Sequence, residues 1–190
     1  MPRTLATIID AQIKKIIKLD EEYYTAVVLP EDIHTVYVLV KNLPDDYVGG
    51  EYLFKLDIPA EFPDKPPHLH ALTPNGLFEL GGQICVSIGT FHQSDFRTTK
   101  AGTYGWRPAI GLSGFILNGI INAMLHFDKE DSGIRIKWES PEVKKKLAKK
   151  SVEYNKNNHA RICNLFEGLK CSEIGSKLKI WSKPQSLPIA

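Results

Sequence analysis

Three short runs of strand-forming residues follow one another between residues 25 and 60, with only tight breaks between them. The runs are TAVVL at 25–29, TVYVLVKNL at 35–43 and EYLFKLDIPA at 51–60. Proline, aspartate and a Gly-Gly pair fill the breaks, as is typical of turns between β-strands. Because no helix-length segment separates the runs, parallel βαβ pairing is excluded and the pattern predicts an antiparallel meander. His68–Leu72, entered through the proline-rich EFPDKPP, is predicted as a fourth strand at the sheet margin.

Helical patterns flank this meander on both sides. Residues 4–19 carry isoleucine and leucine at helical spacing, with lysines mostly on the opposite face. A second apolar face recurs from about Pro108 to Met124. A last helix is predicted to begin at Ser140-Pro141, an N-cap followed by a first-turn proline, and to continue through residue 169. The order of elements is that of an α+β protein.

The length and composition suit one domain with a short appendage, which we place at 1–170 and 171–190. A globule of this size buries roughly 70% of its unfolded surface, so that it needs no disulfide or metal to fold. The net charge is only +2, which disfavours a nucleic-acid partner. Three cysteines at irregular spacings favour a reducing compartment over a disulfide framework.

Metal sites and membrane segments are not expected. His68 and His70 alternate along a strand and share a face, but two ligands do not make a zinc site. No cofactor motif appears, so that we expect no cofactor. The N-terminus carries charge within its apolar pattern, unlike a signal peptide. The longest apolar run, GLSGFILNGIINAML at 111–125, is predicted to be too short and too interrupted to cross roughly 30 Å of hydrocarbon.

The segment TPNGLFELGGQICVS at 73–87 raises the question of a reactive thiol. Cys85 follows a Gly-Gly turn, and thiol catalysis needs a proton acceptor and donors for the developing oxyanion. Asn75 could tie down the loop backbone or donate to an oxyanion. Glu130 and Asp131 could position an incoming amine, and His92 could act as a base.

Each of these residues also has a structural explanation. A cysteine is more often buried and inert than catalytic, and Pro-Asn-Gly is a common turn. Acidic residues after a helix are usually solvated. The papain-type surround of glycine and tryptophan is missing around Cys85. Residues 87–104 are polar and lack periodicity, so that we expect a long surface loop, a kind of segment that is often functional.

The order of motifs resembles that of the ubiquitin-conjugating enzymes. After a basic amphipathic helix come GGEYLF at 49–54, EFPDKPP at 61–67, Pro74-Asn75, Cys85 and WRPA at 106–109. Most members have His-Pro-Asn where this chain has Thr73-Pro74-Asn75, and that departure resembles the tail-anchored, endoplasmic-reticulum, degradation-linked branch. The resemblance covers about residues 3–170. It implies the α+β ubiquitin-conjugating-enzyme fold: an N-terminal helix, a four-stranded antiparallel meander, an active-site loop, a central helix and a C-terminal helix.

The resemblance also implies roles for individual residues. Cys85 would accept ubiquitin as a thioester from the activating enzyme and pass it, with a ligase, to a lysine of a protein substrate. Asn75 would stabilise the oxyanion or hold the loop, and Glu130 and Asp131 would position the lysine. Two surfaces would meet protein partners, the helix lysines the activating enzyme and two loops the ligase: Lys14, Lys15 and Lys18; Pro63, Lys65, Arg107, Pro108 and Ala109.

Three alternatives remain open at this point. The cargo could be a ubiquitin-like modifier, the chain could be a non-catalytic ubiquitin-binding variant, or it could be a cysteine hydrolase with His92 as its base. A non-catalytic variant would lack the cysteine. The ending KLKIWSKPQSLPIA is not an anchor, so that we expect a cytoplasmic location, or the cytosolic face of the endoplasmic reticulum if an anchor has been removed.

Overall fold

The predicted meander is the centre of the fold. The computed structural model describes residues 4–19, 21–29, 31–96, 98–99 and 102–167. Its four-stranded antiparallel sheet has the order β1-β2-β3-β4. The strands are β1 (Tyr24–Leu29), β2 (Asp32–Lys41), β3 (Glu51–Asp57) and β4 (His68–Ala71). The register pairs Val38 with Ala26 on one side and with Phe54 on the other, and all three side chains are buried.

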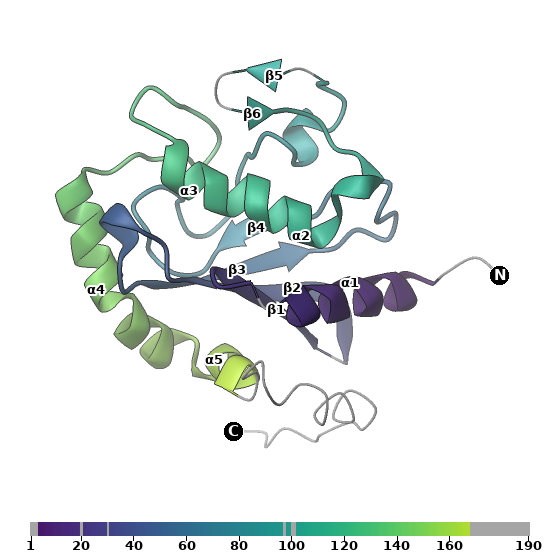
Figure 1. Ribbon diagram of the computed structural model, residues 1–190, viewed down its shortest axis with the longest axis horizontal. Helices are drawn as coiled ribbons and strands as arrows, with labels where there is room; N and C mark the ends of the chain where they lie inside the picture. Colours follow the sequence, from purple (N-terminus) through teal and green to yellow (C-terminus); the bar gives the residue numbers. More distant parts are fainter. Residues whose placement is uncertain (1–3, 20, 30, 97, 100–101, 168–190) are drawn as a thin grey trace.

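Helices cover both faces of the sheet (Figure 1). On one face lies a continuous helical segment made of α2 (Gly111–Phe115), a π-helical turn (Ile116–Ile121) and α3 (Asn122–His126). Helix α1 (Leu5–Leu19) packs against β1 and α2, with Ile9, Ile13, Ile16 and Ile17 buried. The apolar sides of these helices and of the sheet form one hydrophobic core. The predicted α+β order is confirmed.

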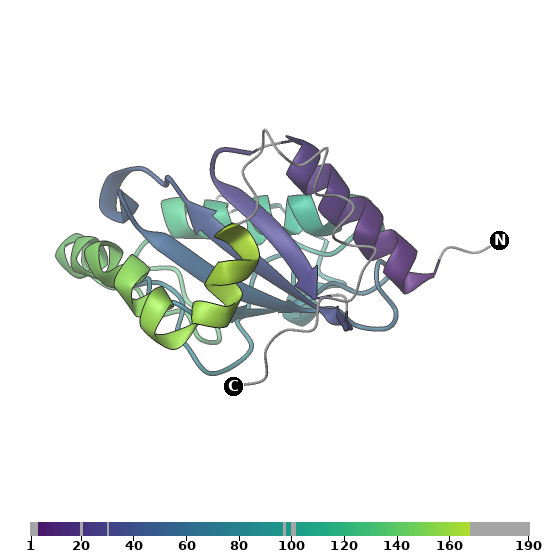
Figure 2. The same ribbon diagram turned by 90° about the horizontal axis from the view of Figure 1, so that it is seen from below.

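The last helix is not continuous, and the prediction of one helix through residue 169 is wrong. Helix α4 (Pro141–Asn158) ends at His159, and α5 (Ala160–Glu167) then crosses the other face of the sheet (Figure 2). The His159 ring forms a hydrogen bond of 3.0 Å with the Leu72 carbonyl, which holds the break against the sheet. Phe166 of α5 packs with Val27 and Leu53. The predicted tail at 171–190 lies outside the described residues.

The central helical segment is longer than the apolar run predicted at 111–125. Pro108–His126 has 19 residues, and an 18-residue window of it has a mean hydropathy of 1.5, so that the segment is long and apolar enough to cross a membrane by length and composition alone. The predicted run at 111–125 is thus part of a longer helical segment than expected. In the fold, its apolar side chains pack into the core, with Leu112, Phe115 and Ile116 fully buried.

The predicted surface loop after Cys85 contains short elements of its own. These are the 3-10 turn η2 (Thr90–His92) and a small hairpin of β5 (Thr98–Thr99) and β6 (Gly102–Thr103), at the top of Figure 1. Two other 3-10 turns, Asp45–Tyr47 and Pro108–Ile110, lead into β3 and into α2. The loop prediction missed these elements because each is too short to show a periodic pattern.

Candidate active site

The Asn75 side chain is buried and fully engaged with the backbone of its own loop. Its amide oxygen accepts hydrogen bonds from the N–H groups of Leu77 (3.0 Å) and Phe78 (2.8 Å). Its amide nitrogen donates to the Thr73 carbonyl (2.9 Å) and, at 3.4 Å, to the Phe78 carbonyl. An asparagine that bonds the backbone two residues on is the ordinary way to fix such a turn. These contacts are the kind that the predicted loop-holding role of Asn75 requires, and its role in the reaction stays a prediction.

The next residue, Gly76, is held between the loop and helix α4. Its φ of +82° lies in the left-handed region, and an added Cβ would lie 2.7 Å from Cγ of Lys144, so that only glycine fits. Lys144 is itself buried, with its ammonium 4.9 Å from the centre of the Trp138 ring. The Gly76 carbonyl accepts a hydrogen bond of 2.9 Å from the Glu139 N–H. The Asn75 turn is therefore packed closely against Lys144 and Glu139.

Thr73 connects the loop to the last long helix. Its hydroxyl is fully buried, accepts a hydrogen bond of 2.8 Å from the Leu53 N–H and donates one of 2.5 Å to the side-chain oxygen of Asn155. Asn155 in turn donates to the Glu51 carbonyl at 2.9 Å. A hydroxyl can accept and donate at once, and this position uses both abilities. This network was not predicted, because its members lie far apart along the chain.

Cys85 is half-buried and lies beside the segment that follows α3. Its N–H donates to the Ile134 carbonyl at 3.0 Å, and a Cβ on Gly133 would lie 3.7 Å from its own Cβ. The same segment pairs with the Asn75 loop, since the Leu77 carbonyl accepts from the Lys137 N–H at 2.8 Å. Burial raises the pKa of the Cys85 thiol, although a hydrogen bond between the backbone of Ile134 and the sulfur partly offsets this. The resting group is therefore a thiol rather than a thiolate at neutral pH.

A histidine lies against this thiol. Nε2 of His92 is 3.2 Å from Sγ of Cys85, and Nδ1 of the same ring is 3.4 Å from Oδ2 of Asp95. The Tyr104 ring meets the His92 ring edge to face, with 5.0 Å between their centres. His92 was predicted as a candidate base, whereas Asp95 and Tyr104 were not predicted as site residues. The spacing of three residues between His92 and Asp95, which puts both on one side of a helical turn, is a signal that could have found Asp95.

The two acids after α3 form a local turn. The Asp131 carboxylate accepts from the Asp128 N–H at 2.9 Å, and the Glu130 N–H donates to the Asp128 carboxylate at 2.8 Å. Glu130 is exposed. No described contact joins Glu130 or Asp131 to Cys85, so that their predicted role in positioning a lysine stays a prediction.

The structure brings together the two loops that were expected to meet a ligase. Trp106 Nε1 donates to the Pro63 carbonyl at 2.7 Å, and its ring lies 6.2 Å from that of Phe62. Lys65, Arg107, Pro108 and Ala109 are exposed beside this joint. The guanidinium of Arg107 lies 5.4 Å from the centre of the Phe96 ring.

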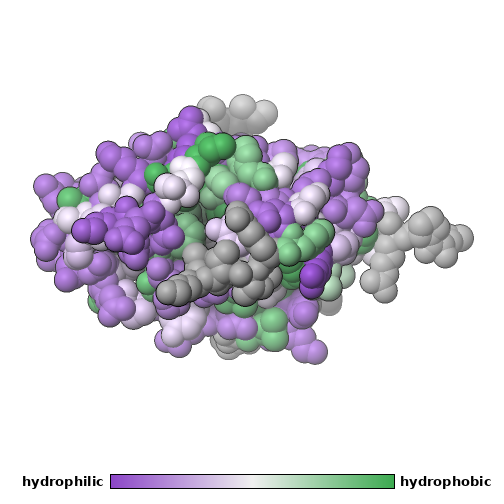
Figure 3. All heavy atoms as spheres, turned by 90° about the horizontal axis from the view of Figure 1, so that it is seen from above, coloured by the Kyte–Doolittle hydropathy of each residue, from purple (hydrophilic) through white to green (hydrophobic). Residues whose placement is uncertain are grey.

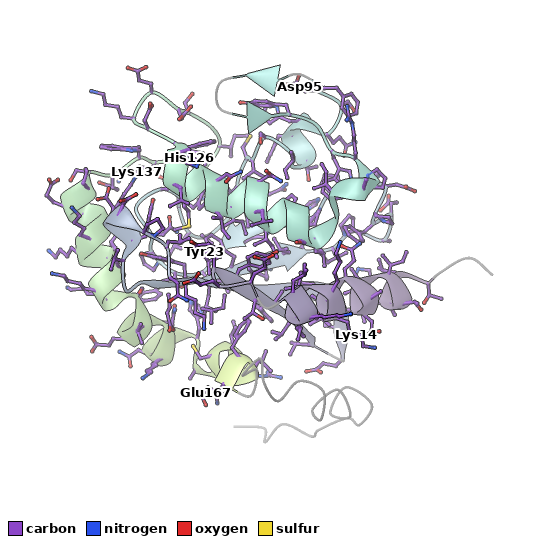
Figure 4. All side chains as sticks on the ribbon, in the orientation of Figure 1. Lys14, Tyr23, Asp95, His126, Lys137 and Glu167 are labelled. Carbon is purple, nitrogen blue, oxygen red and sulfur yellow. The ribbon has the colours of Figure 1, made fainter. Side chains whose placement is uncertain are left out.

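The other expected partner surface lies on α1. Lys14, Lys15 and Lys18 are exposed, and Lys14 pairs with Asp10 at 2.7 Å. Figure 4 shows Asp95 near the top of the view, in the segment that precedes the β5–β6 hairpin, and Lys14 lower down, on α1. Seen from above, the face that carries this hairpin is largely polar with scattered apolar patches (Figure 3). Within the part of the chain that the structure describes, no group of three or more His, Cys, Asp or Glu side chains could hold a metal ion.

Comparison with known proteins gives relatives of one kind. The human "Ubiquitin-conjugating enzyme E2 J2" is 33% identical over 173 residues, which cover 88% of this chain and 60% of that protein. "Ubiquitin-conjugating enzyme E2 6" of Candida glabrata is 31% identical over 137 residues, 72% of this chain and 50% of that protein. No family model matches.

A solved structure agrees in fold. Human ubiquitin-conjugating enzyme E2 G1 superposes with a TM-score of 0.51 at 22% identity, and the match covers 65% of this chain and 95% of that one. The matches therefore span 95% of that solved chain but only 60% of the length of E2 J2. This chain is therefore similar in sequence to ubiquitin-conjugating enzymes and shares the fold of a solved member of that family.

Proposed function

We propose that this domain accepts ubiquitin from an activating enzyme as a thioester on Cys85 and transfers it, with a ligase, to a lysine of a protein substrate. The observation that carries the proposal is the position of Cys85. Its half-buried thiol lies at a loop end and is joined, through the segment that contains Ile134 and Lys137, to a loop locked by Asn75. The names of the relatives support ubiquitin as the cargo.

The chemistry follows from the properties of the thioester. A thiolate is a far better leaving group than an amine, so that transfer to a lysine runs downhill once the amine is oriented and deprotonated. A fixed sulfur position is then the main contribution of the fold. Asn75 serves this by holding the loop backbone, because both of its amide hydrogens and its oxygen are already engaged there. Glu130, on the exposed turn after α3, is the candidate for orienting the lysine.

The partner surfaces and the branch are part of the same proposal. The exposed lysines of α1 would meet the activating enzyme, and the loops joined by Trp106 and Pro63 would meet the ligase. Thr73-Pro74-Asn75 and the similarity to E2 J2 and E2 6 support the tail-anchored branch. The corresponding location is the cytosolic face of the endoplasmic reticulum.

One observation favours a second candidate, a cysteine hydrolase. The contact between Cys85 and His92 has the geometry of a thiol and its base. A hydrolase also needs donors for its oxyanion, and the Asn75 amide, the donor predicted for that purpose, is engaged with carbonyl groups. Thioester transfer also forms an oxyanion, so this point does not separate the two candidates. We prefer the transferase because the relatives of this chain are named as ubiquitin-conjugating enzymes.

A charging assay tests the proposal. The chain is incubated with activating enzyme, ubiquitin and ATP and analysed on a non-reducing gel. We expect a slower band that thiol removes, that is absent in Cys85→Ala and that becomes a thiol-resistant ester in Cys85→Ser. Cys163→Ala, which removes another half-buried cysteine, serves as the matched control and should charge normally. If the wild-type chain forms no adduct with any activating enzyme, the transferase is rejected.

A further inference from the structure

We propose that His92 takes the proton of the Cys85 thiol when Cys85 attacks an incoming thioester, and that Asp95 positions the His92 ring for this step. The inference rests on the proposed function and adds a catalytic residue to it. It is carried by two contacts on opposite sides of one imidazole ring, 3.2 Å from Nε2 to Sγ of Cys85 and 3.4 Å from Nδ1 to the Asp95 carboxylate.

The position of the ring proton decides which nitrogen of His92 is free to act as a base. The proton of a neutral imidazole stays on the nitrogen that faces the better acceptor, and a carboxylate is a better acceptor than a thiol. With its proton on Nδ1 toward Asp95, His92 presents the lone pair of Nε2 to the sulfur. The thiol hydrogen of Cys85 then points at a base within transfer distance.

The Cys85 thiol needs a base to become a good nucleophile. Burial holds the Cys85 thiol in its protonated form, and the thiol is a much weaker nucleophile than the thiolate. Among the described residues, His92 contacts three titratable groups, those of Cys85, Asp95 and Tyr104. No described lysine or arginine contacts the sulfur to stabilise a resting thiolate. The proton must leave during the reaction, and His92 is the group placed to receive it.

The segment that follows Cys85 holds the His92 ring in place. Three turns in succession bring the chain back to Cys85: Gly89 N–H to the Val86 carbonyl (2.9 Å), His92 N–H to the Gly89 carbonyl (3.1 Å) and Asp95 N–H to the His92 carbonyl (2.9 Å). The far end of the segment is tied at Gly105, whose N–H donates to the Ser87 carbonyl at 3.0 Å. The Tyr104 ring then packs against the imidazole edge to face. The segment after Cys85 thus folds back on the cysteine and carries a base to it.

The step balances without an oxidant or a cofactor. The S–H bond of Cys85 breaks and its proton passes to Nε2 of His92. The Cys85 sulfur forms a bond to the thioester carbonyl carbon, and the bond from that carbon to the sulfur of the donor enzyme breaks. The departing thiolate takes up this proton from the imidazolium, which returns His92 to its neutral form.

The test measures the reactivity of Cys85 separately from ubiquitin transfer. In the full 190-residue chain, the rate of alkylation by iodoacetamide is followed by mass spectrometry at Cys85, with Cys163 as the internal reference. We expect His92→Gln to slow alkylation of Cys85 by about 100-fold, the lower end of the range for a general base, and to leave Cys163 unchanged. Asp95→Asn should slow it by less, about 3- to 10-fold. His126→Gln, which alters an exposed histidine at the end of α3, should have no effect.

Two further measurements make the outcome decisive. The single-turnover charging rate with saturating activating enzyme should fall in His92→Gln by a factor similar to that for alkylation. Added imidazole should restore Cys85 reactivity in His92→Gly, which a purely structural role would not allow. Wild-type alkylation rates in His92→Gln, or no rescue by imidazole in His92→Gly, would overturn the inference. A wild-type chain that is never charged by an activating enzyme would reject the proposed function instead, and the alkylation result would still decide the role of His92.

Discussion

The two segments that frame Cys85 are held in different ways. The loop from Thr73 to Phe78 is buried, and the side chains of Thr73 and Asn75 are bonded at both donor and acceptor atoms. The segment from Ser87 to Trp106 lies more at the surface, where its Phe91 and Phe96 are 46% and 60% exposed, and backbone hydrogen bonds close its turns and tie its ends. We infer that the first segment provides stability and a fixed frame, and that the second provides reactivity. Substitutions in the first should therefore change the free energy of unfolding, and those in the second should change rates.

The largest effect on stability is expected for Asn75→Ala. The change leaves the buried N–H groups of Leu77 and Phe78 without an acceptor, at about 1–3 kcal/mol each, so that the free energy of unfolding should fall by about 2–6 kcal/mol. Urea unfolding followed by circular dichroism measures it. Asn118→Ala, at an exposed position in the central helical segment, is the control and should change it by about 0.5 kcal/mol or less. Equal losses in the two variants would break the contrast between the segments.

The next effect is expected for Thr73→Val, which keeps the shape and removes the hydroxyl. The Leu53 N–H then loses its acceptor, which should lower the free energy of unfolding by about 1–3 kcal/mol. Thr73→Ser keeps the hydroxyl and should lose less, because only a methyl group is removed. Comparison of the two urea midpoints separates the hydrogen bonds from the packing. A serine variant as unstable as the valine variant would show that the methyl group matters and the network does not.

A smaller effect concerns pH. Burial raises the pKa of Cys85 in the folded state, so that the unfolded chain ionises this thiol first as pH rises. The contribution of Cys85 to stability is present below the ordinary cysteine range, near pH 8.5, and is lost as pH rises toward the folded-state pKa. The free energy of unfolding of the wild type relative to Cys85→Ser should therefore fall at alkaline pH, by less than the limit of about 1.4 kcal/mol per pH unit for one proton. If the wild type instead became more stable relative to Cys85→Ser as pH rises, the raised pKa of Cys85 would be contradicted.

The smallest effect on stability is expected for His92→Gln. The side chain of His92 is 27% exposed on a surface segment, so that the free energy of unfolding should change by about 0.5 kcal/mol or less. The same variant is expected to lose most of its Cys85 reactivity. Thermal unfolding measured beside the alkylation rate tests both statements on one sample. A loss of stability as large as that of Asn75→Ala would show that the two segments do not divide their roles.

The sequence predicted the parts of this fold that depend on local pattern. Alternation and tight breaks predicted the four strands, and the spacing of Ile9, Ile13 and Ile16 predicted α1. The break between α4 and α5 was not predicted, because His159 ends the helix where its ring contacts the Leu72 carbonyl, a contact between residues far apart in the sequence. The same distinction between local pattern and long-range contact holds for the site. Cys85 and Asn75 stand in recognisable motifs, whereas the contact from Asp95 through His92 to the sulfur depends on how a surface segment folds back.

The Thr73 hydroxyl has a consequence for how this protein can be divided. It is bonded to Asn155, which lies in the final turn of α4 and also reaches the Glu51 carbonyl. A fragment that ends before Asn155 would open the start of the active-site loop to water and leave the first residue of β3 without its cap. The shortest piece of this chain that retains a working site therefore extends through the whole of α4, even though that helix contributes no residue to the chemistry.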